Sequence, residues 1–179
     1  VLLKNENNAL PRADKKMNIF GVSSFNFRYG GGGSGGSDTS RAITLYDGLE
    51  EAGISYNQEL KEFYQGMPEV KESGSSSTGL MQIAQMMFSG NENDEPEIDY
   101  LTDDVLKQAK DYSDNAMIVI ASSGVESSDM SDEDLKISEN TKALINRVAE
   151  EFDNITVVVN AGNALELGYL EEVPQIKSI

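Results

Sequence analysis

Residues 115–129, Asn-Ala-Met-Ile-Val-Ile-Ala-Ser-Ser-Gly-Val-Glu-Ser-Ser-Asp, decide the fold of this 179-residue chain. Met117 to Ala121 is an unbroken apolar run rich in β-branched side chains, which predicts a strand buried on both faces. Such strands are typical of parallel sheets covered by helices. The run ends in a loop of small and hydroxyl side chains, and ligands of open α/β sheets bind at the carboxyl ends of the strands. We therefore expect the chemical centre of the chain in this loop.

Apolar runs and helical patterns alternate along the rest of the chain. The first run, 17–22, is followed by a glycine-rich loop, a helix that Asp38, Thr39 or Ser40 caps, and a second strand at 54–56. The later patterns predict a helix from Thr102 to near Tyr112, a helix from a capping box at 131–134 to Asp153, a strand at 155–159, a short helix at 164–170 and a final strand start at 173–179. This alternation predicts an α/β fold: a three-layer sandwich with a mostly parallel sheet flanked by helices on both faces.

The length predicts a single domain over residues 1–179, within which 57–104 is a variable or inserted region. Inside that region, 80–88 is apolar enough for a short helix. The chain opens without Met and closes on 173–179, which has the pattern of a strand that has just begun. We therefore expect a piece of a longer protein that is incomplete at its C-terminal end and leaves a sheet edge exposed.

The charge and the missing residue types exclude several functions. A net charge of −17 argues against nucleic acid and against an anionic membrane surface as partners. The chain has no Cys and no His, which excludes disulfides, a Ser-His-Asp triad and zinc held by His or Cys. No transmembrane span is visible. Acid–base chemistry must therefore rest on Asp, Glu, Lys or Tyr, and we expect neither a metal nor a cofactor.

The glycine loop carries six glycines between Gly30 and Gly36. One interpretation is a loop that lets a polar ligand approach the backbone closely. A second is a phosphate cradle at a helix N-terminus, although the Lys-Ser/Thr that completes a phosphate-binding loop is absent. A third is a flexible linker. Composition alone leaves the three open.

Glu126 is the one acidic residue inside the loop that follows the central strand, with Asp129 three residues later. It is either a solvated carboxylate on a surface turn or a catalytic proton donor. Serines flank it and supply hydrogen bonds without a fixed positive charge, so a partly desolvated carboxyl here is expected to hold its proton near neutral pH. Glycoside hydrolysis needs such an acid opposite a second carboxylate.

Several motifs in order carry a family resemblance over nearly the whole chain. These are Val1-Leu-Leu-Lys-Asn-Glu6 with Leu10-Pro11, Ile19-Phe-Gly21, Tyr29-Gly-Gly-Gly-Gly-Ser-Gly35, Leu45-x-x-Gly48-Leu49 with Ala52-Gly53, Ala116-Met-Ile-Val-Ile-Ala with Gly124-Val-Glu126-Ser-Ser-Asp129, and Val157-Val-Val-Asn160-x-Gly162-Asn163. Together they resemble glycoside hydrolase family 3, and within it the α/β-sandwich domain that accompanies the catalytic barrel.

The resemblance implies a two-domain retaining glycosidase, often a β-glucosidase, that hydrolyses terminal β-linked sugars. The nucleophilic Asp would lie on the barrel domain, and this domain would supply the general acid/base and part of the sugar pocket. Carried over, Glu126 is the acid/base, and the substrate-binding residues are Gly32, Gly33, Ser34, Gly35 and Asp129. The implied partners are a carbohydrate substrate and the barrel of the same protein, and a homo-oligomer is open.

Two further functions stay open. Val125 stands where the family has a glycine, and Ser122 and Ser123 stand where many members have Arg, which favours a non-catalytic sugar-binding or structural module. Because of the glycine loop, a nucleotide-binding α/β domain is the other function that stays open. The family has cytoplasmic and secreted bacterial members, so the resemblance leaves the compartment undetermined.

Overall fold

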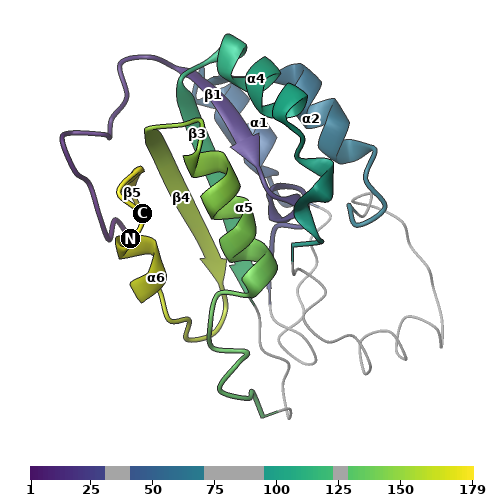
Figure 1. Cartoon of the computed structure of the whole chain (residues 1–179), viewed down its shortest axis with the longest axis vertical. Helices are drawn as coiled ribbons and strands as arrows, with labels where there is room; N and C mark the ends of the chain where they lie inside the picture. The colour runs from purple at the N-terminus through teal and green to yellow at the C-terminus, as the bar shows by residue number, and fades with distance from the viewer. Residues whose placement is uncertain (31–40, 71–94, 123–128) are drawn as a thin grey trace.

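The computed structural model of the chain describes residues 1–30, 41–70, 95–122 and 129–179. Within them five strands form one sheet in the order β2-β1-β3-β4-β5, and each strand is parallel to its neighbours (Figure 1). Their bounds are β1 Lys16–Phe20, β2 Ser55–Tyr56, β3 Asn115–Ser122, β4 Asn154–Ala161 and β5 Ile176–Ser178. The predicted α/β fold with a parallel sheet is confirmed.

The strand predicted from the quoted stretch is the centre of the sheet. β3 pairs with β1 on one side and with β4 on the other, and the β3–β4 register runs from Asn115↔Asn154 to Ser122↔Ala161. Positions 115–120 of β3 are all buried, as the apolar run predicts. Because parallel strands end at the same edge, the carboxyl ends of β1, β3 and β4 lie together at the lower end of Figure 1.

Alternate side chains of the strands divide the core into two layers. Phe20, Ile118 and Ile120 face α2, α4 and α5, whereas Ile19 and Val119 face α1. The helices are α1 Leu45–Glu51, α2 Gln58–Gln65, α4 Asp103–Tyr112, α5 Glu139–Ala149 and α6 Gly168–Glu171, with 3-10 turns η1 Val22–Ser24 and η3 Ile98–Tyr100. The sheet therefore lies between helices on both faces, as the three-layer prediction requires.

The starts of two predicted helices are corrected by the structure. α1 is capped by Thr44, whose side chain accepts from the Asp47 N–H in a capping box, and not by Asp38, Thr39 or Ser40. The box at 131–134 exists, but it closes a turn, and α5 begins only at Glu139 behind its cap Ser138. The reason is that Lys136 first forms a parallel bridge with Glu166, which keeps the chain extended between the two caps.

α2 and α4 cover the sheet beside each other. α4 begins behind its cap Thr102 and ends at Tyr112, as predicted. α2 has no counterpart in the sequence prediction, although Asn57 caps it and Leu60 and Tyr64 bury one face. The predicted helix at 80–88 lies outside the described residues.

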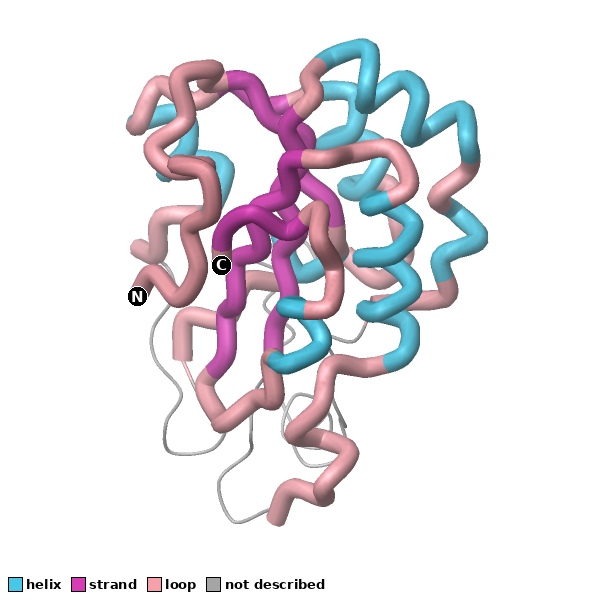
Figure 2. Tube along the Cα trace, turned by 60° about the vertical axis from the view of Figure 1, so that its left-hand side comes forward, coloured by secondary structure: helices cyan, strands magenta, loops and turns pink. Residues whose placement is uncertain are grey.

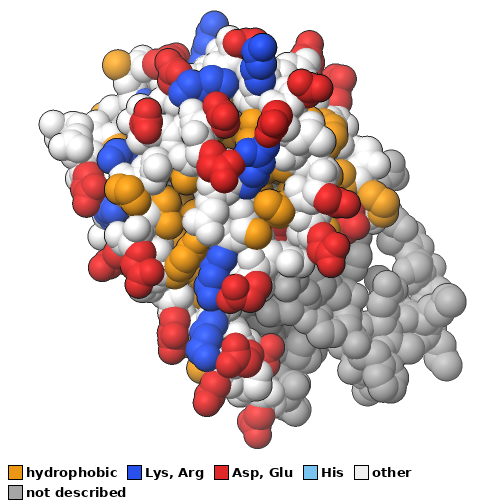
Figure 3. All heavy atoms as spheres, in the orientation of Figure 1, with side chains coloured by type: hydrophobic (Ala, Val, Ile, Leu, Met, Phe, Trp, Pro, Cys, Tyr) orange, Lys and Arg blue, Asp and Glu red, His pale blue; other side chains and the backbone are white. Residues whose placement is uncertain are grey.

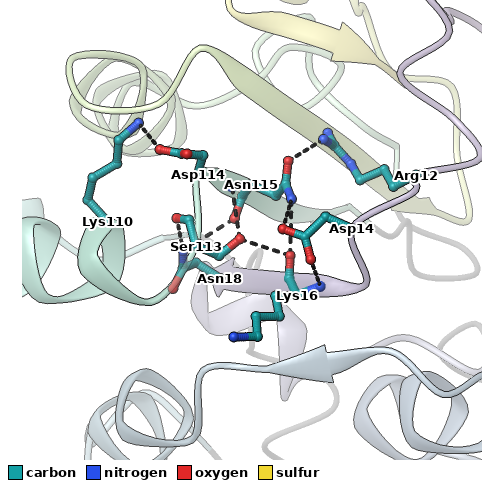
Figure 4. Close-up of polar contacts among 8 residues, drawn as sticks. All are labelled: Arg12, Asp14, Lys16, Asn18, Lys110, Ser113, Asp114 and Asn115. Atoms are coloured by element: carbon teal, nitrogen blue, oxygen red, sulfur yellow. Dashed lines mark hydrogen bonds and ion pairs between the residues drawn. The ribbon is translucent and has the colours of Figure 1, made fainter.

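A belt of hydrogen-bonded residues crosses the sheet near the amino ends of β1, β3 and β4; Figure 4 shows its part around Arg12, Asn18 and Asn115. We call it the amino-edge belt; its members are Arg12, Asn18, Asn57, Asn115, Thr156 and Ser178. β1, β3, β4 and β5 each contribute one member. The two other members lie outside the strands: Asn57 follows directly after β2, and Arg12 precedes β1.

The contacts of the belt are continuous from one end of the sheet to the other. Asn57 Nδ2 donates to Asn18 Oδ1 at 2.9 Å, and Asn18 Nδ2 donates to the Asn115 carbonyl at 3.3 Å. Arg12 then donates to Asn115 Oδ1 at 2.6 Å and to Thr156 Oγ1 at 3.0 Å, and Thr156 contacts Ser178 at 2.9 Å. The belt links all five strands through buried polar groups, which are costly to leave unpaired.

The two ends of the chain meet at the outer edge of β5 (Figure 2). The Leu3 N–H donates to the Ile179 carbonyl at 2.8 Å, the Glu6 N–H donates to the Lys177 carbonyl at 2.8 Å, and Asn5 forms an antiparallel bridge with Ser178. The expectation of an exposed edge is therefore wrong for β5, because the N-terminal segment occupies its backbone groups.

Candidate functional site

The carboxyl edge of the sheet is built from the ends of β1, β3 and β4. β1 runs into a tight turn at Gly21, whose φ of 97° is a conformation that favours glycine. A Cβ on Gly21 would lie 2.7 Å from the Val119 carbonyl oxygen, so β1 and β3 approach too closely there for any side chain. The turn continues as η1, all of whose residues are buried.

The segment that follows η1 crosses to the end of β4, where Asn160 holds it. The Arg28 N–H donates to Asn160 Oδ1 at 2.5 Å, and Asn160 Nδ2 donates back to the Arg28 carbonyl at 3.0 Å. Phe27 and Tyr29 on either side of Arg28 contact each other with ring centroids 5.5 Å apart. The segment that leads to the glycine loop is therefore fixed over the carboxyl edge.

A buried carboxylate lies beside the turn. Glu95 is 3% exposed, and its Oε2 accepts from the Val22 N–H at 3.1 Å. Its Oε1 accepts a short hydrogen bond from the Tyr100 hydroxyl, which contacts the hydroxyl of Tyr64 at 3.4 Å. Burial raises the pKa of Tyr100, and Tyr64 and Glu95 raise it further. Burial likewise raises the pKa of Tyr64, with Glu95 adding to the effect.

Polar atoms without partners gather at this edge. Among the described residues, the buried side-chain atoms with no hydrogen bond include Ser122 Oγ, Asn163 Oδ1 and Arg28 Nε. Ser122 is the last residue of β3 and is 4% exposed. It lines a cavity of about 30 Å³ with Lys136, Ser138 and Thr141 at the start of α5. A cavity of this size holds one or two water molecules or hydroxyl groups.

The structure describes only some of the residues that the sequence predicts for the site. Glu126 and the pocket residues Gly32, Gly33, Ser34 and Gly35 lie outside the described residues. Asp129 is described, and its side chain is exposed. Asn160 and Asn163 do lie at the carboxyl edge, as their place after β4 predicts.

The sequence prediction missed Glu95 as a member of the edge. It belongs to a run of acidic residues that predicts an exposed loop, and nothing local distinguishes it from Glu97 or Asp99. Its contacts join residues as far as 73 positions apart, which only the tertiary structure brings together.

The surface contains mixed charges on the face drawn in Figure 3. Acidic side chains are spread over it, with Lys and Arg side chains between them, and no large basic patch is visible there. In the described part of the chain, no three acidic side chains are grouped as a metal site would require. No helix within the described ranges has the length and hydropathy to cross a membrane.

Known β-glucosidases are similar to the chain over most or all of its length. It is 27% identical to β-glucosidase A of Butyrivibrio fibrisolvens over 206 aligned residues, covering 100% of this chain and 23% of that protein. It is 28% identical to a β-glucosidase of Ruminococcus albus over 182 residues, covering 96% of this chain and 17% of that protein. The chain thus spans about a fifth of the length of these curated relatives.

Solved structures agree with the sequence relatives. The β-glucosidase 3B of Thermotoga neapolitana, solved with glycerol, superposes with a TM-score of 0.74 at 25% identity, covering 100% of this chain and 24% of that one. A β-glucosidase of Paenibacillus barengoltzii has the same fold, with a TM-score of 0.75 at 24% identity, covering 99% of this chain and 19% of that one. The family model of the glycosyl hydrolase family 3 C-terminal domain matches residues 1–179, so the chain belongs to glycoside hydrolase family 3.

Proposed function

We propose that this chain is the domain of a β-glucosidase-like retaining glycosidase that supplies the general acid/base, Glu126, and part of the sugar pocket. The observation that supports this most is the common origin of the two candidate loops. The glycine stretch follows Arg28, which Asn160 holds at the end of β4, and the stretch with Glu126 follows Ser122, the last residue of β3. Both loops therefore leave from the carboxyl edge, where ligands of α/β sheets bind.

The proposed chemistry is a double displacement. Glu126 protonates the leaving glycosidic oxygen while an Asp on the barrel domain attacks the sugar. Glu126 then removes a proton from the water that releases the sugar. Glycines at 32–35 let the sugar approach the backbone, and Asp129, which is exposed, binds a sugar hydroxyl. The isolated domain is inactive in this scheme because half of the carboxylate pair lies elsewhere.

The test is Glu126→Ala in the intact protein, assayed on aryl β-glucosides with a good and a poor leaving group. We expect a loss of about 100-fold or more on the poor leaving group, a smaller loss on the good one, and recovery with azide. Asp132→Ala, which removes an exposed carboxylate outside the proposed site, is the matched control and is expected to leave both rates unchanged.

A non-catalytic sugar-binding module is the second candidate, because Val125 and Ser122 replace the residues that the family resemblance leads us to expect. Unchanged rates for Glu126→Ala on both substrates would remove the catalytic proposal. Binding of glucose without turnover by the intact protein would then favour the second candidate.

A further inference from the structure

Glu95 is a buried carboxylate that the proposed mechanism does not use. Its side chain and backbone contact three separate elements at the carboxyl edge. One carboxylate oxygen accepts from the Val22 N–H in η1, and the other accepts from the Tyr100 hydroxyl in η3. Its backbone carbonyl accepts from Asn140 Nδ2 at 2.9 Å, in the first turn of α5. Glu95 therefore joins the end of β1 to the start of α5.

The contact with Val22 acts where the geometry is tightest. Gly21 is in the left-handed region, and a Cβ placed on it would lie 3.6 Å from Glu95 Oε2 and 2.7 Å from the Val119 carbonyl oxygen. The carboxylate thus packs directly on the turn that redirects the chain after β1. A hydrogen bond to the Val22 N–H fixes the direction in which the chain leaves the sheet.

Several contacts hold the segment that crosses the edge, among them the contact of Ser24 Oγ with the Tyr46 hydroxyl at 3.3 Å and the bond from Asn26 Nδ2 to the Glu69 carbonyl at 2.9 Å. Glu95 holds its beginning at Val22, and Asn160 holds its end at Arg28. The glycine stretch begins two residues after Arg28. Glu95 therefore fixes the first residue of an anchored segment that leads toward residues that the proposed function assigns to the sugar.

We propose that Glu95 is a positioning residue for the sugar-binding edge, acting through the Val22–Arg28 segment. The proposal rests on the proposed function, because it assumes that the carboxyl edge serves the reaction. Glu95 does not touch substrate in this role, since it is 3% exposed. Its effect is on the geometry of the loops, and a displacement of about 1 Å in such a support costs up to about 100-fold in rate.

The variant Glu95→Gln separates the effect of the hydrogen bonds of residue 95 from the effect of its negative charge. In Glu95→Gln the amide oxygen still accepts from the Val22 N–H, and the amide NH₂ donates to the Tyr100 hydroxyl, which is able to accept as well as donate. The hydrogen-bond frame survives while the negative charge is lost. Glu95→Ala removes the side-chain contacts with Val22 and Tyr100.

The experiment measures kcat/KM of the intact protein on an aryl β-glucoside, at a temperature where circular dichroism shows each variant folded. We expect a loss of about 10–100-fold for Glu95→Ala and of less than about 3-fold for Glu95→Gln. Asn18→Ala is the matched control: it removes a fully buried polar hub at the amino edge, and we expect it to lower Tm while leaving kcat/KM within about 2-fold of the parent.

Three results would overturn the proposal: an unchanged kcat/KM for Glu95→Ala, an equal loss for Asn18→Ala, or a loss in Glu95→Gln as large as in Glu95→Ala. If Glu95→Ala does not fold, Glu95→Asp keeps the charge but shortens the side chain by one methylene, which pulls the carboxylate away from the Val22 N–H, and an unchanged kcat/KM for this variant would overturn the proposal equally. The fate of the proposed function is decided separately, by the Glu126→Ala rates and azide recovery. If Glu126→Ala leaves the rates unchanged, the acid/base assignment is removed. The difference in kcat/KM between Glu95→Ala and Asn18→Ala still reports whether the carboxyl edge serves the active site.

Discussion

The two edges of the sheet differ in how many of their buried polar side-chain atoms have a hydrogen-bond partner. At the amino edge, the belt pairs side chains from β1, β3, β4 and β5 and from Asn57 directly after β2, and Arg12 Nε is its one buried side-chain atom without a partner. At the carboxyl edge, Ser122 Oγ, Asn163 Oδ1 and Arg28 Nε have no partner within the described residues.

The contrast separates stability from function. An unpaired buried polar group costs about 1–3 kcal/mol, so such groups usually bind a water molecule, a ligand or a neighbouring group. The belt is the pattern of a structural support, whereas the proposed function assigns the carboxyl edge to the sugar site. Three predictions test this contrast between the two edges.

The largest effect is expected from Asn18→Ala at the amino edge. Asn18 is fully buried and donates to the carbonyls of Ser113 and Asn115, while its Oδ1 accepts from Asn57. Its removal breaks these bonds and leaves Asn57 Nδ2 without an acceptor, which should lower the free energy of unfolding by about 3 kcal/mol. Urea denaturation of the chain measures this. A loss below about 1 kcal/mol would mean that the belt is not a support.

A smaller effect is expected from alkaline pH, through Tyr64 near the carboxyl edge. Burial raises the pKa of Tyr64 above its ordinary value near 10, so the folded chain keeps a proton that the unfolded chain releases. This contribution is complete below about pH 10 and is lost as the pH rises further, by about 1.4 kcal/mol per pH unit. The amino-edge belt contains no tyrosine or lysine.

Tyr64→Phe isolates that contribution. We expect the decline in unfolding free energy between pH 10 and 11 to become shallower by about 1 kcal/mol relative to the parent chain. Lysines titrate in both proteins and cancel in the difference. Identical slopes would show that the Tyr64 hydroxyl is not protected in the folded chain.

The smallest effects come from a matched pair of hydroxyl deletions. Thr156→Val removes a hydroxyl that binds Arg12 and Ser178, and should cost about 1–2 kcal/mol. Ser122→Ala removes a hydroxyl with no partner, and should change stability by less than about 0.5 kcal/mol or increase it. Both are measured by the urea midpoint. Equal losses for the two variants would remove the distinction between the edges.

The sequence predicted those parts whose signal is local. The β-branched run at 117–121 placed the central strand, and Thr102 and Tyr112 bound α4 as expected. The start of α5 was wrong because a capping box also stabilises a turn, and only the bridge between Lys136 and Glu166 reveals which of the two forms.

The carboxyl edge is harder to predict because its contacts are distant in sequence. Asn160 and Arg28 are 132 positions apart, and Glu95 and Val22 are 73 apart. A buried carboxylate within an acidic run has no local pattern that separates it from solvated neighbours. Glu126 and the glycines at 32–35 rest on the family resemblance and stay predictions.

The amide of Asn160 has a consequence for how this domain changes in evolution. Its oxygen and nitrogen bind the N–H and the carbonyl of residue 28, so it imitates a neighbouring peptide group and makes no use of the side chain at that position. Substitutions at 28 other than proline therefore leave this anchorage intact, whereas position 160 requires an amide side chain. The side chain presented at position 28 can therefore change while the path of the crossing segment stays the same.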